Sequence, residues 1–161
     1  MTIKKTIFKI LIIAGISLPM QLYLPITVQA ASCSGNDCED LNPQTMGCGD
    51  DAVRSGSRKI ISDGYSFVET RYSATCDTKW VRTTNKSGGN RYAAGSLRYG
   101  CANYCYDKSI SSPAKISNNS TVYSMMHAPG AATPTRSCGI VSTSGPISIP
   151  ISVDISCTGA N

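Results

Sequence analysis

The end of the chain alternates between apolar and polar residues with great regularity. From Ile147 to Ser156 every second residue is Ile or Val, and a period of two predicts a half-buried β-strand with one apolar face. Pro150 has no N–H to give to a ladder, so the strand is expected at a sheet edge. Residues 139–143 are its expected hairpin partner, and Cys138 and Cys157 would join the open ends of this hairpin.

An earlier hairpin is predicted around Asp63-Gly64. The runs 58–62 and 65–72 are rich in β-forming residues, and Asp-Gly between two such runs is typical of a type I′ turn, in which both turn residues have positive φ. On the second strand, successive side chains point to opposite faces of the sheet. One face is expected to carry Val68, Thr70 and Tyr72. The opposite face is expected to carry Phe67, Glu69 and Arg71.

Three further strands follow from the same pattern, at residues 79–84, 92–99 and 121–126, with Gly95 as the expected position of a bulge. No apolar periodicity of helical type and comparable length occurs after residue 30. The sequence therefore predicts an all-β fold, a small antiparallel barrel or sandwich of about six to eight strands stapled by disulfides.

The first thirty residues form a separate unit. Three lysines precede a mostly apolar stretch, and Val28-Gln29-Ala30 supplies small residues where a signal peptidase cleaves. We expect residues 1–30 to be a removed signal peptide and residues 31–161 to form one domain, with 31–41 as a solvated polar N-terminal arm. A transmembrane anchor and a lipid anchor on Cys33 are the alternatives, but a basic stop-transfer cluster is absent and Ala30 stands where a lipoprotein signal has Leu.

Removal of the signal peptide changes the charge of the protein. The whole chain carries 15 Lys and Arg against 10 Asp and Glu, but three of the lysines lie in the first thirty residues, which leaves a net charge of +2. The remainder contains neither a run of basic residues nor a second long apolar segment. Nucleic acid is therefore not an expected partner, and no membrane span is expected after cleavage.

All eight cysteines lie in the predicted mature chain, at positions 33, 38, 48, 76, 101, 105, 138 and 157. An even number of cysteines in an exported protein predicts a disulfide framework. A zinc site is the competing interpretation, but no C-x2-C pair is present. Our working hypothesis is that neighbours pair in sequence order, as Cys33–Cys38, Cys48–Cys76, Cys101–Cys105 and Cys138–Cys157.

Two segments carry a resemblance to a known family. They are N-P-Q-T-M-G-C-G-D-D-A at Asn42–Ala52 and E-T-R-Y-S-A-T-C-D-T-K-W-V-R at Glu69–Arg82. Together they resemble the YjfA-like family of small secreted bacterial proteins, domain-of-unknown-function family 2690. Asn42, Thr70 and Val81 depart from the family pattern. The resemblance implies export and strengthens the Cys48–Cys76 pairing, but it implies no reaction.

The same stretch supplies the candidate binding surface, which consists of Glu69, Arg71, Tyr72, Trp80 and Arg82. Clustered aromatic and charged side chains on paired strands are typical of an interaction surface. Lys59 or Arg58 is the expected cross-strand partner of Glu69. Two structural interpretations remain open: the charged residues would simply be a solvated sheet face, and Trp80 is more readily a core residue than a stacking platform.

The favoured function is that of a secreted, non-enzymatic interaction module, with cell-wall carbohydrate or another extracellular protein as its partner. The alternative is a secreted hydrolase or a toxin- or inhibitor-type protein. No catalytic residue, resident metal or cofactor is predicted. The single histidine, His127, has no carboxylate partner that the sequence pattern identifies, so a structural role is favoured over that of a general base.

Overall fold

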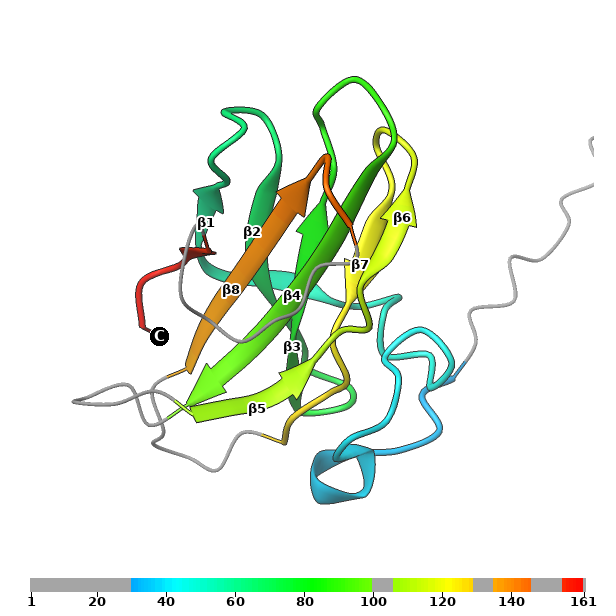
Figure 1. Cartoon of the computed structure of the whole chain (residues 1–161). Coiled ribbons are helices and arrows are strands. Elements are labelled where there is room, and N and C mark those ends of the chain that lie inside the picture. The colour runs from blue at the N-terminus through cyan, green and yellow to red at the C-terminus, as the bar shows by residue number, and fades with distance from the viewer. Residues whose placement is uncertain (1–29, 100–105, 129–134, 146–154, 161) are drawn as a thin grey trace, which may run out of the picture.

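The structure, a computed structural model, describes residues 30–99, 106–128, 135–145 and 155–160 (Figure 1). Within them a short 3-10 helix precedes nine strands: η1 (Gly35–Cys38), β1 (Val53–Ile60), β2 (Phe67–Ser73), β3 (Thr78–Thr84), β4 (Arg91–Tyr99), β5 (Tyr106–Ile110), β6 (Ala114–Ile116), β7 (Thr121–Tyr123), β8 (Thr135–Ser142) and β9 (Ser156–Cys157). The predicted all-β class is confirmed. The predicted signal peptide, the pair Cys101–Cys105 and nearly all of the predicted strand at 147–155 lie outside the described residues.

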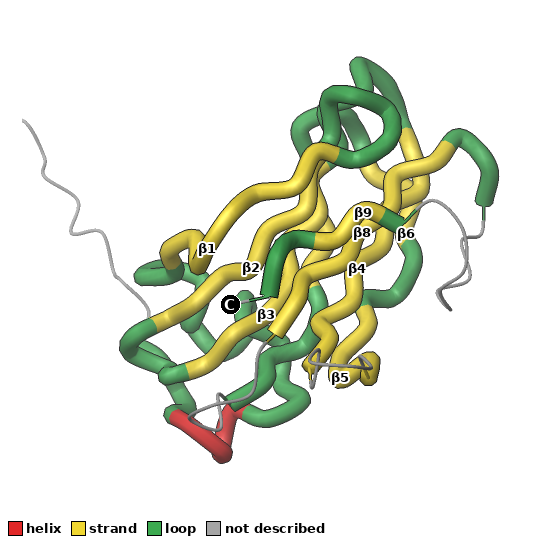
Figure 2. Tube along the Cα trace, turned by 90° about the vertical axis from the view of Figure 1, so that its left-hand side faces the viewer, coloured by secondary structure: helices red, strands yellow, loops and turns green. Residues whose placement is uncertain are grey.

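The strands form two antiparallel sheets. Sheet A has the order β1-β2-β3-β7, and sheet B has the order β5-β4-β8-β9, with β6 also paired to β4. The two sheets lie face to face, β2 and β3 against β4 and β8 (Figures 1 and 2). Of the two predicted architectures, the described residues form the sandwich. Among these residues no helix has the length and apolar character needed to cross a membrane.

Two glycines allow the sheets to approach closely. Gly95 of β4 lies directly opposite Gly139 of β8 in the register of sheet B. A Cβ at Gly95 would lie 2.7 Å from Val81 Cγ1, and a Cβ at Gly139 would lie 2.7 Å from Val68 Cβ. The predicted bulge at Gly95 is therefore wrong for the β4–β8 ladder, because this glycine makes room for sheet A. The irregularity of β4 lies at Leu97/Arg98, where it pairs with β5.

The space between the sheets is filled by small side chains, several of them polar. Val68, Val81 and Leu97 form one apolar group, and Thr70 Oγ1 lies 2.7 Å from Ser137 Oγ across the sandwich. Buried hydroxyl groups destabilise a fold unless they are hydrogen-bonded. Any shift of β2 on β8 would break this bond and leave both hydroxyl groups without a partner, so the bond favours one position of the two strands.

The residues before β1 pack on the outer face of sheet A, the face turned away from sheet B. We call residues 30–52 the N-terminal arm. Cys38 and Cys48 of the arm form a buried group with Cys76, Trp80 and Met126, and Met126 N donates to Leu41 O over 2.9 Å. The predicted arm at 31–41 is thus exposed along much of its length but fastened at Cys38, which is fully buried. Figure 2 shows η1 and its loops at one end of the two layers.

The predicted hairpin at Asp63-Gly64 is present, but its turn differs from the prediction. Gly64 has φ 79°, whereas Asp63 is not among the residues with positive φ. Six residues separate β1 from β2, and Asp63 Oδ1 accepts hydrogen bonds from the backbone N–H groups of Tyr65 and Ser66, over 2.9 and 2.8 Å. The Asp63 carboxylate therefore closes a wider loop, which a two-residue type I′ turn would not need.

Candidate functional site

Three arginines surround one glutamate on the outer face of sheet A. Glu69 of β2 pairs with Arg82 of β3, and Arg71 lies two residues further along β2. Arg58 reaches the same carboxylate from β1. We call Arg58, Glu69, Arg71 and Arg82 the arginine cluster. It brings together three of the five predicted site residues and adds Arg58.

The Glu69 carboxylate is buried and bonded on both oxygens. Arg58 donates to Oε2 from Nε over 3.2 Å and from Nη2 over 3.1 Å, so two of its donors share one carboxylate oxygen. On Oε1, Arg82 Nη2 donates a short hydrogen bond and Arg71 Nη1 lies 3.4 Å away. Only 1% of the Glu69 side chain is exposed. The expectation of a solvated charged face is therefore wrong at Glu69, because the three arginines cover it.

The arginine cluster carries more positive than negative charge. Its ion pairs join three guanidinium groups to the single carboxylate of Glu69. Burial lowers the pKa of Arg71, and the neighbouring charge of Arg82 lowers it further, while the Glu69 carboxylate acts in the opposite direction. The arginines are exposed to different degrees, with 39% of the side chain of Arg58, 27% of Arg82 and 16% of Arg71 accessible.

Neighbouring groups hold the arginines in place. The Cζ atom of Arg58 lies 3.6 Å from the centre of the Phe67 ring, a cation–π contact that orients the guanidinium group. Arg71 Nη2 donates to the backbone oxygen of Ala52 at the end of the arm. Arg54 of β1 pairs with Arg71 in register and is exposed, so it adds a fourth positive charge to the same face.

The other two predicted site residues are not part of the arginine cluster. Trp80 is paired with Arg71, but it is 1% exposed beneath the arm, so the core interpretation is correct and its ring offers no stacking surface. Tyr72 has the opposite strand parity to Glu69 and Arg71, and its hydroxyl donates to Asp77 Oδ1 over 3.0 Å. That hydrogen bond raises the pKa of Tyr72.

Sequence alternation could place Glu69 and Arg71 on one face, but it could not choose between Arg58 and Lys59 as the partner of Glu69. The ladder between β1 and β2 is irregular between Ser55 and Lys59, and this irregularity sets which β1 side chain reaches Glu69. The dipeptide Arg58-Lys59 leaves that choice open, because neighbouring strand residues point to opposite faces.

The disulfides agree with the predicted pairing wherever the structure describes them. Cys33–Cys38, Cys48–Cys76 and Cys138–Cys157 are formed, and the described residues include no free cysteine. The first two bridges lie together, since the sulfur atoms of Cys33, Cys38, Cys48 and Cys76 are all within 4.8 Å of one another. Cys33–Cys38 closes a loop within the arm, and Cys48–Cys76 fastens the arm to the turn between β2 and β3.

His127 has a carboxylate partner that the sequence did not indicate. Its Nδ1 lies 3.1 Å from both carboxylate oxygens of Glu39, and Glu39 Oε2 also accepts the backbone N–H of Ala128 over 2.8 Å. The backbone of His127 exchanges two 2.8 Å hydrogen bonds with Lys79 on β3. Eighty-eight residues separate the pair, so no local motif could reveal it, and its evident effect is to hold the arm against sheet A.

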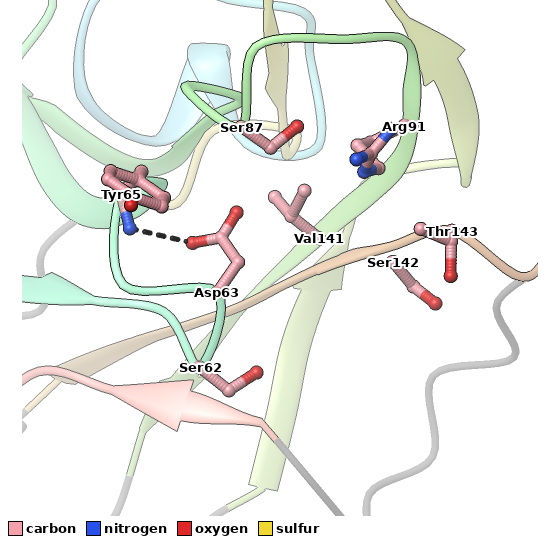
Figure 3. A pocket seen from close by; sticks show the side chains of 8 residues that line it. All are labelled: Ser62, Asp63, Tyr65, Ser87, Arg91, Val141, Ser142 and Thr143. Atoms are coloured by element: carbon pink, nitrogen blue, oxygen red, sulfur yellow. Dashed lines mark hydrogen bonds between the residues drawn. The ribbon is translucent and has the colours of Figure 1, made fainter.

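A shallow cleft of about 410 Å³ opens at the loop end of the sandwich, away from the arginine cluster. Its lining residues are Ser62, Asp63, Tyr65, Ser87, Arg91, Val141, Ser142 and Thr143 (Figure 3). Hydroxyl groups and one exposed aromatic ring suit a small polar molecule. Both charged side chains are engaged locally, however: Asp63 closes its own loop, and Arg91 Nη1 donates to Asn90 O over 2.9 Å.

Comparison with known proteins identifies a family but no function. The model of a family described as "Protein of unknown function (DUF2690)" matches residues 32–138, a range that contains the arginine cluster, His127 and all but the first two residues of the arm. No curated protein and no solved structure matches the chain. The match agrees with the predicted domain of unknown function, while the designation YjfA-like stays a prediction. The chain therefore belongs to the DUF2690 family, whose members are proteins of unknown function.

Proposed function

We propose that this protein is an exported, non-enzymatic interaction module that binds anionic groups of an extracellular partner on the outer face of sheet A. The observation that carries the proposal is the arginine cluster, where three guanidinium groups share one buried carboxylate. The three arginines exceed the single carboxylate by two positive charges. This excess attracts an anion placed over the cluster, and the anion does not need to displace Glu69.

The cluster has donors left for such an anion. A guanidinium group has five N–H donors, and Arg58 and Arg82 each direct only part of theirs to Glu69. Arg82 Nε has no hydrogen-bond partner among the described residues but is buried, so the accessible donors of Arg82 are those at its exposed end. Because the arginines are held by Phe67 and by Glu69, little side-chain entropy remains to be lost on binding. Carboxylate and phosphate are the groups that match this forked donor geometry.

Export is supported by the cysteines and by the start of the chain. Three disulfides are formed within the described residues, and disulfides persist chiefly in oxidising compartments. The predicted signal peptide at 1–30 agrees with such a location. We therefore place the partner outside the cell, as a cell-wall carbohydrate that carries acidic groups or as an acidic surface of another extracellular protein.

The alternative, a secreted hydrolase or a toxin- or inhibitor-type protein, has one observation in its favour. The His127–Glu39 pair has the geometry of a base with an orienting carboxylate. However, both residues are engaged in holding the arm, and the cleft lined by Asp63 and Arg91 lies at the other end of the sandwich. An interaction module makes use of the charge that the sheet displays, whereas a hydrolase would leave the arginine cluster unexplained.

The test is binding of the purified protein to two anionic polymers, polygalacturonate with carboxylates and polyglycerol phosphate with phosphodiesters, with neutral dextran as the reference. We expect binding to an anionic polymer that weakens as salt rises and falls about tenfold in Arg58→Gln, because one charge-assisted contact contributes roughly 1.5 kcal/mol. Arg58→Lys, which keeps the charge but loses the fork, should be intermediate.

Arg91→Gln is the matched control, because it removes the same charge from the loop end of the sandwich and should leave binding unchanged. Circular dichroism shows whether each variant keeps the β-fold. Equal binding by wild type and Arg58→Gln, or equal binding to dextran, would contradict the proposal.

A further inference from the structure

The two disulfides of the arm bring four sulfur atoms into one small volume. Every pair of Sγ atoms among Cys33, Cys38, Cys48 and Cys76 lies within 4.8 Å. Cys38, Cys48 and Cys76 are fully buried, and Cys33 is half-buried. We call this group the four-sulfur cluster. Two disulfides require only that the two sulfur atoms of each bridge lie within bonding distance. The proximity of all four sulfur atoms is therefore a separate property of the fold.

This spacing is close to that of a tetrahedral metal site. Zinc–thiolate bonds of about 2.3 Å place the sulfur atoms of a four-cysteine zinc site about 3.8 Å apart. Once both disulfides are reduced, sulfurs from different bridges would have to approach by at most about 1 Å to reach that separation, while bonded partners would move apart. Cys33 and Cys38 are also separated by four residues, which is within the usual spacing of a zinc-ligand pair.

The backbone around the cluster is held by contacts that do not depend on the disulfides. Gly35 N donates to Cys76 O over 2.8 Å, and Ser32 N donates to Met46 O over 3.0 Å. On the other side, Cys76 N donates to Ser73 Oγ over 3.0 Å. The first bond joins the arm to the β2–β3 turn, the second holds the arm together and the third holds the turn. We expect these bonds to keep the four thiols close together after reduction. Trp80 and Met126 pack against them and keep water away.

We propose that the reduced form of this protein binds one Zn²⁺ ion through the thiolates of Cys33, Cys38, Cys48 and Cys76. A dithiol or phosphine reductant supplies two electrons and two protons to each disulfide, which gives four thiols. Zn²⁺ then displaces the thiol protons into solvent, and the metal itself is neither oxidised nor reduced. The four-sulfur cluster thus has two exclusive states, two disulfides or one zinc tetrathiolate, and either state fastens the arm. This inference does not depend on the proposed function.

The purified protein is reduced with a phosphine, and the reductant is then removed under anaerobic conditions. The reduced protein is titrated with Co²⁺ and then with Zn²⁺. Tetrahedral cobalt thiolate has an intense visible absorption, which Zn²⁺ displaces. We expect one metal ion per chain. Cys38→Ser and Cys76→Ser should each weaken zinc binding by more than about 100-fold, because even an outer-shell partner accounts for 10–100-fold.

Two control variants separate the cluster from the other cysteines. Cys138→Ser/Cys157→Ser and Cys101→Ser/Cys105→Ser each remove a pair outside the cluster and should keep the full cobalt spectrum. Absence of a tetrathiolate spectrum in the reduced wild-type protein would overturn the proposal. A spectrum that persists in both Cys38→Ser and Cys76→Ser would also overturn it, since the metal would then be bound elsewhere.

Discussion

Glu69 is the only acidic member of the arginine cluster, so the stability of this face of the sheet depends on one carboxylate. Breaking a buried ion pair typically costs 3–5 kcal/mol, because the remaining charge stays buried without its partner. The arginines here are partly exposed, so we expect Glu69→Gln to lower the free energy of unfolding by about 3 kcal/mol, measured by urea denaturation. Asp37→Asn, which alters an exposed carboxylate of the arm, should change it by less than about 0.5 kcal/mol. A comparably small loss in Glu69→Gln would show that water already neutralises the arginines.

Asp51 gives the molecule a sensitivity to acid. Burial on its own would raise the pKa of Asp51, but hydrogen bonds from Ser73 and Thr75 outweigh it and lower this pKa below its ordinary value of 3.8. The folded protein therefore binds the proton less tightly than the unfolded chain. The resulting stabilisation is complete above the ordinary pKa and is lost as the pH falls through the lower, folded value.

Asp51→Asn should therefore remove part of the pH dependence of stability in the acid range. We expect the melting temperature of the variant to be lower than that of wild type at pH 7, and the two curves to converge as the pH falls below the lowered pKa of Asp51. Thermal melts between pH 2 and 7 measure this difference. A constant difference across that range would mean that Asp51 acts through hydrogen-bond geometry and not through its charge.

At the scale of the strands, Gly95 and Gly139 set the distance between the sheets. A methyl group at either position would meet Val68, Val81 or Thr83 at 2.7 Å. We expect Gly95→Ala and Gly139→Ala each to destabilise the protein by about 1–3 kcal/mol through overpacking. Gly159→Ala is the matched control, because a Cβ there has nothing within 4 Å. If all three variants melt alike, the sheets adjust their separation freely.

The two disulfides of the arm differ in the length of chain that they close. Cys48–Cys76 spans 28 residues and Cys33–Cys38 spans 5. On the chain-entropy model, loss of the longer bridge costs about 3.5 kcal/mol and loss of the shorter about 2 kcal/mol. The variant Cys48→Ser/Cys76→Ser should therefore melt at a lower temperature than Cys33→Ser/Cys38→Ser. Trp80 fluorescence, which reports on the contact of the arm with sheet A, should shift to the red at the same transition.

Strand positions could be predicted from the sequence where the residues of one strand, without their neighbours in the sheet, are sufficient to indicate a strand. The predicted strands at 79–84 and 92–99 correspond closely to β3 and β4, although both strands are buried on both faces over most of their length. β5 and β6 were not predicted, since strands of five and three residues carry too little apolar alternation to be recognised. Contacts between distant strands were not predictable: the burial of Glu69 and the His127–Glu39 pair depend on register and on how the arm folds back.

For the whole molecule, we expect the exported protein to begin at Ala31 and to carry no reactive thiol. Mass spectrometry of the protein recovered from the culture medium, alkylated without prior reduction, measures both properties. Cleavage after Ala30 would leave Ala31 and Cys33 in place against the buried group around Trp80. A diacylglycerol mass on Cys33 would contradict the prediction and indicate a lipid-anchored protein.

The position of the arm's two disulfides also determines how the molecule would carry a mechanical load. A pull on the chain at residue 31 passes through Cys33–Cys38 and then through Cys48–Cys76 into the turn between β2 and β3. Only the residues between these covalent links can extend, so the hydrogen bonds of residues 39–47 to sheet A can open while Cys48–Cys76 still holds the end of the arm. Tension at this end is then delivered to the hydrogen-bonded ladder of β2 and β3, the two strands that carry Glu69, Arg71 and Arg82.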